Sequence, residues 1–296
     1  MQRAGVIGLG DMGSGLARNL IQAGFETAGY DPSEPRMAAF AELGGTPTAS
    51  ARAVGEHADA VFVMVMNGGQ AREAILGADG LVGALKPGSA VLLTATIEPR
   101  EAVALAEGLE GSGITLIDTP VSGGFAGAQS GSLTMMAAAP GPVLARFRPF
   151  MEAVSSTIHH VGEAPGMGQT VKACLQSLIG SIFGATFEAA ALAAKAGVPG
   201  QVLHDVVSTS GAGCGVANTA LRHIVDRRFA GTGSHIRTMH KDLTIALDFA
   251  REQGVPLFTA AVAMQLFQAG ITRHPDGDNW VVTRVLEEIV GAELHR

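Results

Sequence analysis

The 296-residue sequence is poor in cysteine, with only Cys174 and Cys214. The two do not have the spacing of a metal-binding motif, and no other cluster of histidine, cysteine and acidic residues stands near them. So low a cysteine content is typical of a reducing compartment, where both thiols stay free. We therefore expect a cytoplasmic protein that binds no metal.

Positive charge is also scarce. The chain has 20 Lys and Arg against 27 Asp and Glu, a net charge of −7, and no predicted helix carries a basic stripe. This pattern excludes nucleic acid as an expected partner. By inspection, no apolar run is long enough to span a membrane, and a strand pattern begins at Arg3, which leaves no room for a signal peptide. We therefore expect no membrane partner.

Apolar residues are plentiful, at 47% of the chain, whereas only 16% of residues are charged. A chain of this length is comfortable for two globular domains. So few charged residues cannot cover a large surface in contact with solvent, which favours burial of part of the surface between subunits. We expect a homodimer or homotetramer.

The first half of the chain alternates short apolar runs with helix-like segments. This alternation predicts an α/β domain with a mostly parallel sheet that is covered on both faces. Beyond about residue 162 only helical patterns remain, separated by glycine and proline at 197–199, 211–213, 231–233, 254–256 and 274–277. The predicted domains are therefore 1–163 and 164–296, joined by a long helix. The predicted strands are 4–9, 25–30, 60–66, 90–95, 114–118 and 133–139.

A glycine-rich turn follows the first predicted strand and opens a helix. Its first glycine permits the tight turn, the second lets a pyrophosphate approach, and the third allows close helix–strand packing. Asp31 ends the second strand, at the spacing where a carboxylate binds a ribose diol. Since Asp31 would repel a 2′-phosphate, NAD is favoured, although the nearby Arg36 leaves NADP open. The predicted cofactor-binding turn is Gly8, Leu9, Gly10, Asp11, Met12 and Gly13.

A second turn, Ser122, Gly123 and Gly124, follows the strand that ends at Asp118. Its backbone N–H groups could form a nest for an anion such as a substrate carboxylate. Alternatively, the glycines serve only the geometry of a tight turn. The spacing does not distinguish these interpretations.

The predicted helix at 166–190 carries Lys172 as its one charge between Glu163 and Glu188. Lys172 and Gln176 are four residues apart and share one helix face. The lysine is either a surface residue whose stem covers apolar groups or a buried functional amine. Cys174 points to a different face, where we expect it to pack in the core.

Four segments together resemble the β-hydroxyacid dehydrogenase family. This family includes 3-hydroxyisobutyrate dehydrogenases and threonate-type dehydrogenases, within the 6-phosphogluconate dehydrogenase superfamily. The resemblance implies a Rossmann-type domain, an all-α domain with a long interdomain helix, and oxidation of a small β-hydroxy acid by NAD or NADP. The segments are GLGDMGSGLARNLIQAG (8–24), DTPVSGGFAGAQSGSLTMM (118–136), GMGQTVKACLQ (166–176) and HKDLTIALDFA (240–250).

The resemblance also implies residue roles. Lys172 matches the catalytic lysine, a general acid and base, and burial beside an oxidised nicotinamide would lower its pKa. Gln176 stands where many relatives have Asn, and we expect it to orient the substrate hydroxyl or carboxylate. The turn at Ser122, Gly123 and Gly124 would hold the substrate carboxylate. The further residues expected to contact the cofactor are Val65, Met66, Thr96 and Lys241.

Glutamine at position 176 is a feature of threonate-type relatives, which act on longer polyhydroxy acids. A four-carbon sugar acid is therefore the alternative to a 3-hydroxyisobutyrate-like substrate. Imine reductases share the two-domain layout but generally lack a lysine at the position of Lys172, so the sequence disfavours them. A non-catalytic NAD-sensing module would not need the face formed by Lys172 and Gln176.

Overall fold

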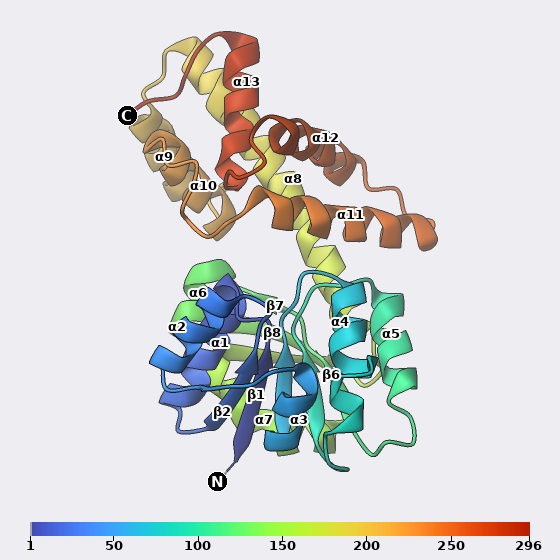
Figure 1. Cartoon of the computed structure of the whole chain (residues 1–296). Helices are drawn as coiled ribbons and strands as arrows, with labels where there is room; N and C mark the ends of the chain where they lie inside the picture. The colour runs from blue at the N-terminus through green and yellow to red at the C-terminus, as the bar shows by residue number, and fades with distance from the viewer. Residues whose placement is uncertain (1) are drawn as a thin grey trace. The chain divides into compact units, whose positions relative to one another are not determined.

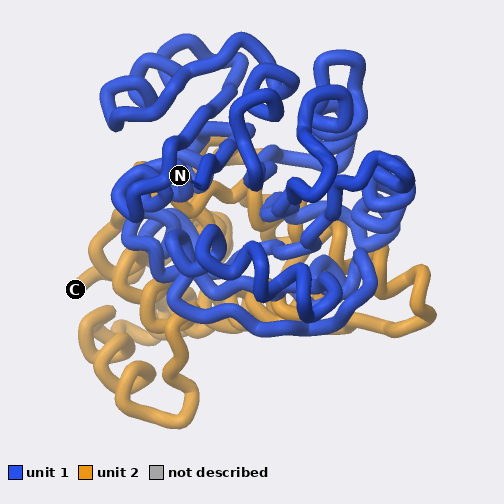
Figure 2. The backbone as a smooth tube through the Cα atoms, turned by 90° about the horizontal axis from the view of Figure 1, so that it is seen from below, with its two compact units in different colours: residues 1–172 blue, residues 173–296 orange. Residues whose placement is uncertain are grey.

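The computed structural model describes residues 2–296, which form two compact units (Figure 2). The first unit ends at Lys172 and the second runs from Ala173 to Arg296. The division falls inside the long helix α8 (Met167–Ala196), whereas the sequence pattern predicted a junction before that helix, at 163/164. Lys172 therefore belongs to the first unit and Gln176 to the second.

The first unit contains one nine-stranded sheet in the order β3-β2-β1-β4-β5-β6-β8-β7, with β9 paired to β8. Neighbouring strands from β3 to β6 are parallel, while β8 is antiparallel to β6 and β7. The six predicted strands are confirmed. Three others were not predicted: β3 and β7, which have only two residues each, and β9, whose sequence SSTIHHVG is mostly polar. The strands are β1 Arg3–Ile7, β2 Glu26–Tyr30, β3 Thr46–Pro47, β4 Ala60–Val63, β5 Ala90–Leu93, β6 Thr115–Asp118, β7 Val121–Ser122, β8 Leu133–Ala138 and β9 Ser155–Gly162.

Helices cover both faces of this sheet (Figure 1). In β4, for example, Phe62 points into one hydrophobic cluster while Val61 and Val63 point into the other, because side chains alternate along a strand. The first face packs against α1 Asp11–Gln22, α2 Glu34–Glu42, α6 Gly124–Ser130 and α7 Gly141–Val154. The second packs against α3 Ala51–His57, α4 Gly68–Leu76, the 3₁₀ turn Leu81–Gly83 and α5 Pro99–Gly108. The predicted α/β fold with a covered parallel sheet is confirmed.

The second unit is all helical, and each predicted break falls between two helices. Its core is an aromatic cluster in which Phe183 stacks on Phe187 at 5.7 Å and meets Trp280 edge-on at 5.8 Å between ring centroids. After α8 come α9 Gly200–Thr209, α10 Gly215–Val225, α11 Ile236–Glu252, α12 Phe258–Arg273, the 3₁₀ turn Asn279–Val281 and α13 Val282–Val290.

Helix α8 corrects one expectation. It is 30 residues long and contains an 18-residue window of mean hydropathy 1.5, so its length and composition would allow it to cross a membrane. The expectation that no run is long enough was therefore wrong, because alanine and glycine join the larger apolar side chains into one long stretch. Within the second unit, Phe187 of this helix is fully buried in the core. A core helix of a soluble protein passes the same test, so this feature is weak evidence for a membrane span.

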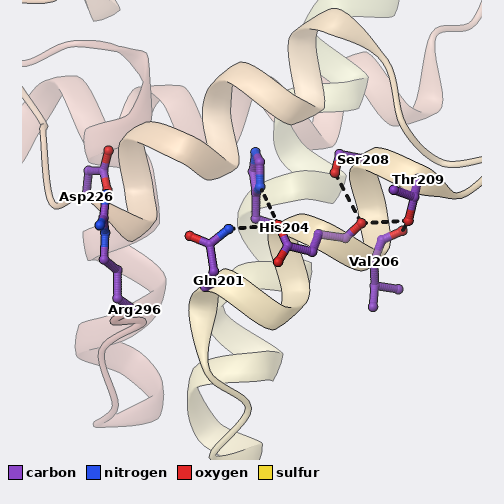
Figure 3. Close-up of polar contacts among 8 residues, drawn as sticks. Gln201, His204, Val206, Ser208, Thr209, Asp226 and Arg296 are labelled. Carbon is purple, nitrogen blue, oxygen red and sulfur yellow. Dashed lines mark hydrogen bonds and ion pairs between the residues drawn. The ribbon is translucent and has the colours of Figure 1, made fainter.

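The polar groups along α9 and at the C-terminus of the second unit are used in local contacts (Figure 3). Gln201 donates to the carboxylate of Asp205, one turn ahead, at 2.7 Å. The Arg296 guanidinium donates twice to Asp226, at 2.9 and 2.6 Å. Across residues 2–296, no group of three or more histidine, cysteine and acidic side chains is arranged to hold a metal ion.

Candidate active site

Two glycines of the Gly8–Gly13 turn are required by the packing of the protein itself. Gly8 has φ +87°, and a Cβ there would lie 2.2 Å from the carbonyl oxygen of Met64. A Cβ on Gly13 would lie 1.7 Å from the carbonyl oxygen of Gly8. Any side chain at either position would force the turn away from β4 or from its own first residue.

Gly10 is different, because the protein does not require a glycine there. Its φ is −68°, and a Cβ would approach no atom closer than the guanidinium carbon of Arg36, at 3.8 Å. It is the N-cap of α1, and no side chain caps that helix end. The turn lines a pocket of about 210 Å³ together with Ser14 and Arg36. Open space beside a glycine at an uncapped helix N-terminus fits the pyrophosphate of a dinucleotide.

Asp31 is fixed beside this turn. Its carboxylate accepts the backbone N–H of Leu9 at 2.8 Å and that of Ser33 at 2.9 Å, and only 5% of the residue is exposed. Arg36 approaches the same carboxylate at 3.3 Å, with its own side chain 55% exposed. The residue predicted to select NAD therefore lies at the nucleotide turn and shares its charge with Arg36.

The three other cofactor candidates of the first unit follow neighbouring strands. Val65 and the half-exposed Met66 come after β4, and the Met66 N–H donates to the side chain of Gln70 at 2.9 Å. Thr96 comes after β5 and is partly buried. Because β1, β4 and β5 are adjacent and parallel, these residues leave the sheet at the same edge as the glycine turn.

Lys172 is buried, with 6% exposure, and its Nζ donates to the carbonyl oxygen of Val121 at 2.9 Å. Of the two interpretations open from the sequence, the surface lysine is excluded. Val121 directly precedes the Ser122 turn, so the structure brings the amine to that turn. Gly123 and Gly124 have φ of 131° and 58°, which explains both glycines by geometry. A Cβ on Gly124 would meet no atom within 4 Å, so space is also open there.

Two polar residues that sequence reasoning did not single out connect the start of α8 to the sheet. Asp118, at the end of β6, is fully buried and accepts the backbone N–H of Gly166 at 2.9 Å. Gln169, 1% exposed, donates through Nε2 to Asp118 at 2.9 Å. Burial raises the pKa of Asp118 to about 6, although hydrogen bonds from Gln169 and Gly166 oppose the rise. In the sequence, the signal that could have identified Asp118 was a carboxylate at the end of an apolar strand.

In the second unit, Gln176 and Lys241 meet at a common partner. The Gln176 Nε2 donates to Asp242 at 2.5 Å, and the Lys241 Nζ lies 2.9 Å from the same carboxylate. Gln176 and Asp242 are 6% and 4% exposed. An ionised carboxylate only accepts hydrogen bonds, so the amide nitrogen of Gln176 must face Asp242 and its carbonyl oxygen must point elsewhere.

Two other polar residues of the second unit lie near these side chains in the sequence. Cys174 is exposed, so the prediction that it packs in the core was wrong. The ring of His240 lies 2.8 Å from the side-chain oxygen of Gln268, one helix away.

Comparison with known proteins gives two family matches that together cover most of the chain. Residues 3–162 match the NAD binding domain of 6-phosphogluconate dehydrogenase, and residues 166–286 match the NAD-binding domain of NADP-dependent 3-hydroxyisobutyrate dehydrogenase. An L-threonate dehydrogenase of Cupriavidus necator is 35% identical, over 98% of this chain and 97% of that protein. A 3-hydroxyisobutyrate dehydrogenase of Pseudomonas aeruginosa is 33% identical, over 88% and 89%.

The crystal structure of a 3-hydroxyisobutyrate dehydrogenase from Salmonella typhimurium superposes with a TM-score of 0.89, at 33% identity, over 96% of this chain and 100% of that one. The fold and the nucleotide turn define an NAD(P)-dependent oxidoreductase. The chain belongs to the β-hydroxyacid dehydrogenase family, as predicted from its motifs. It transfers hydride between a nicotinamide cofactor, NAD or NADP, and the CH–OH group of a small hydroxy acid.

Proposed function

We propose that this enzyme oxidises a four-carbon sugar acid of the threonate type, with NAD as the preferred cofactor and Lys172 as general base. The observation that carries the catalytic assignment is the buried amine of Lys172, held 2.9 Å from the Val121 carbonyl beside the Ser122 turn. A buried, oriented amine next to a turn whose two glycines are exposed suits proton transfer at a carboxylate-bearing substrate.

When bound, the nicotinamide accepts or returns the hydride. Lys172 takes the hydroxyl proton during oxidation and gives it back during reduction. Its hydrogen bond to Val121 holds the amine at a constant distance from the turn. The backbone N–H groups of Ser122, Gly123 and Gly124 bind the substrate carboxylate, and the turn of open backbone leaves room for it.

Gln176 supports the choice of a sugar acid over 3-hydroxyisobutyrate. Its amide nitrogen donates to Asp242 at 2.5 Å, so its carbonyl oxygen is the part of the amide that remains to meet a substrate. We infer that this oxygen accepts a hydrogen bond from a substrate hydroxyl rather than binding the carboxylate. A four-carbon sugar acid has hydroxyls beyond the one that is oxidised, and the Cupriavidus necator relative is named for such a substrate.

We further propose a role for each of the two predicted domains. Residues 1–163 bind the cofactor through Gly8–Gly13, Asp31, Val65, Met66 and Thr96, and residues 164–296 contribute Gln176 and, to the cofactor, Lys241. The buried carboxylate of Asp31 supports NAD over NADP, because a 2′-phosphate would meet its charge.

The surface of the second unit supports assembly into a homodimer or homotetramer. Large apolar side chains are exposed there, among them Leu192 at 71%, Phe258 at 78% and Val262 at 60%. A second copy of the chain would remove such side chains from water. Both cysteines are free thiols, which supports a cytoplasmic location.

The test of the catalytic assignment is Lys172→Met, which keeps an unbranched side chain one atom shorter and removes the amine. We expect turnover to fall by about 10²- to 10⁴-fold, the usual contribution of a general acid or base, while NAD affinity stays within about twofold. Lys195→Met on the same helix is the matched control, since that exposed amine donates to the carbonyl oxygen of Val290 at 2.7 Å. Full turnover in Lys172→Met would refute the role.

The test of the substrate assignment uses a panel of hydroxy acids that includes threonate and 3-hydroxyisobutyrate. The wild type should prefer threonate. Gln176→Leu should lower kcat/KM for threonate by about 10-fold or more, because a substrate hydroxyl is left without its acceptor, and change the 3-hydroxyisobutyrate value far less. Equal losses for both acids would contradict the role given to Gln176.

A further inference from the structure

We propose that Gln169 and Asp118 are positioning residues for catalysis, which together set where Lys172 stands relative to the Ser122 turn and to the backbone around Thr96. This inference rests on the proposed role of Lys172. Neither residue reaches a reacting group in the mechanism above, yet both are more completely buried than Lys172 itself.

Gln169 uses its whole amide to connect α8 with the loop after β5. Its Oε1 accepts the backbone N–H of Ile97 at 3.1 Å, and its Nε2 donates to the carbonyl oxygen of Ala95 at 3.0 Å. These two residues flank Thr96. The same Nε2 also donates to Asp118 at 2.9 Å. Because the amide oxygen must face a donor and the nitrogen two acceptors, the side chain cannot flip without losing all three bonds.

Asp118 fixes the backbone of the first turn of α8. One carboxylate oxygen accepts the N–H of Gly166 at 2.9 Å and the N–H of Gln169 at 3.2 Å, so it acts as a cap from another element. Gly168 lies so close to the sheet that a Cβ there would be 2.7 Å from the carbonyl oxygens of both Asp118 and Met136. The start of the helix is therefore held in direct backbone contact with β6 and β8.

Lys172, on the next turn of this helix, bonds to the chain just after Asp118. It lies three residues after Gln169, one turn along, and its amine bonds to Val121, three residues after Asp118. Two acceptors of the segment from Asp118 to Val121 thus hold the first turns of the helix: the Asp118 carboxylate accepts backbone N–H groups, and the Val121 carbonyl accepts the amine. A shift of that turn by a fraction of an ångström would displace the amine from the Ser122 turn.

The experiment compares Gln169→Leu with Asn19→Leu. Asn19 is a matched control, because it is also a buried amide of the first unit that bonds only backbone carbonyls, those of Gly15 and Ala128, at 2.7 and 2.8 Å. Both variants should lose stability. For Gln169→Leu we expect kcat per folded molecule to fall by about 10- to 100-fold, the effect of a misplacement of about 1 Å. The KM for the substrate should change by less than about threefold.

The decisive readout is the primary deuterium isotope effect on kcat, with a substrate deuterated at the oxidised carbon. A misplaced base slows the chemical step, so the isotope effect should rise in Gln169→Leu. A variant that only lowers the folded fraction, as expected of Asn19→Leu, keeps the wild-type isotope effect. An unchanged isotope effect in Gln169→Leu, or a wild-type kcat, would overturn the proposal.

A second pair of variants covers the case in which Gln169→Leu does not fold. Gln169→Glu alone places two carboxylates together, whereas in Asp118→Asn with Gln169→Glu the asparagine can again donate to residue 169 and accept the helix N–H groups. We expect the double variant to recover part of the kcat that Gln169→Glu loses; no recovery would count against the pair. Full turnover in Lys172→Met would defeat the proposed function itself, whereas an inactive Lys172→Met with a fully active Gln169→Leu would defeat only this inference.

Discussion

Gly13 and Gly10 of the nucleotide turn should respond differently to alanine, and the difference separates packing from cofactor binding. At Gly13 the new Cβ would lie 1.7 Å from the Gly8 carbonyl oxygen, well inside any allowed contact. We expect Gly13→Ala to lower the free energy of unfolding by about 3 kcal/mol or more, the upper range for overpacking.

At Gly10 the same change should leave stability nearly unaltered. The φ of −68° is open to alanine, and no atom lies within 3.8 Å of the new Cβ. Alanine is a poorer N-cap than glycine by about 0.5–1 kcal/mol, but it also restricts the unfolded chain by about 0.4–1 kcal/mol. The two terms nearly cancel. NAD affinity should instead fall by about 10- to 100-fold, since the methyl group would cost at least one phosphate hydrogen bond worth about 1.5–3 kcal/mol.

Urea denaturation without nucleotide and calorimetric titration with NAD measure the two effects separately. Wild-type NAD affinity in Gly10→Ala would show that the pyrophosphate does not bind beside Gly10. A loss of stability as large as that of Gly13→Ala would show that the turn is packed more tightly than the distances indicate.

Two further predictions concern buried carboxylates. Since burial raises the pKa of Asp118 from 3.8 to about 6, the folded protein binds a proton between pH about 4 and 6 that the unfolded chain has released. The free energy of unfolding should therefore fall by about 3 kcal/mol as pH rises through this window. Urea denaturation at several pH values should show this fall in the wild type and not in Asp118→Asn. If the stability of both proteins changed with pH in parallel, the linkage would be contradicted. Asp31→Asn keeps an acceptor for Leu9 but removes the charge, so the ratio of kcat/KM with NADP to that with NAD should rise by about 10-fold or more in steady-state assays, and an unaltered ratio would show that Asp31 does not select the cofactor.

Much of the fold follows from patterns that are local in the sequence. Continuous apolar runs marked six of the nine strands but not β9, the longest, and glycine and proline marked every break between the C-terminal helices. The glycine turn and Asp31 were recognisable because both flank predicted strands. The helix pattern left the burial of Lys172 open, and the resemblance of this position to the family's catalytic lysine favoured the correct interpretation.

What could not be predicted depends on contacts between distant residues. Gln169 and Asp118 are 51 positions apart, and Gln176 and Asp242 are 66 apart. Each pair is set by how helices and strands meet, which no periodicity encodes. Cys174 illustrates the opposite failure: a small thiol in an apolar helix has a strong tendency to be buried, yet its position on the helix surface leaves it exposed.

The hydrogen bonds between Asp118 and the first turn of α8 also determine where the chain can be cut into independently folding fragments. A fragment ending at Gly162 would stop at a natural-looking boundary, after the last strand, yet it would leave the Asp118 carboxylate buried without Gly166 and Gln169. An unpaired charge of that kind is expected to unfold or rearrange the edge of the sheet. An independently expressed first unit therefore needs helix α8 at least to Lys172. A fragment that ends at Gly162 should fold fully only when a peptide with the start of α8 is added.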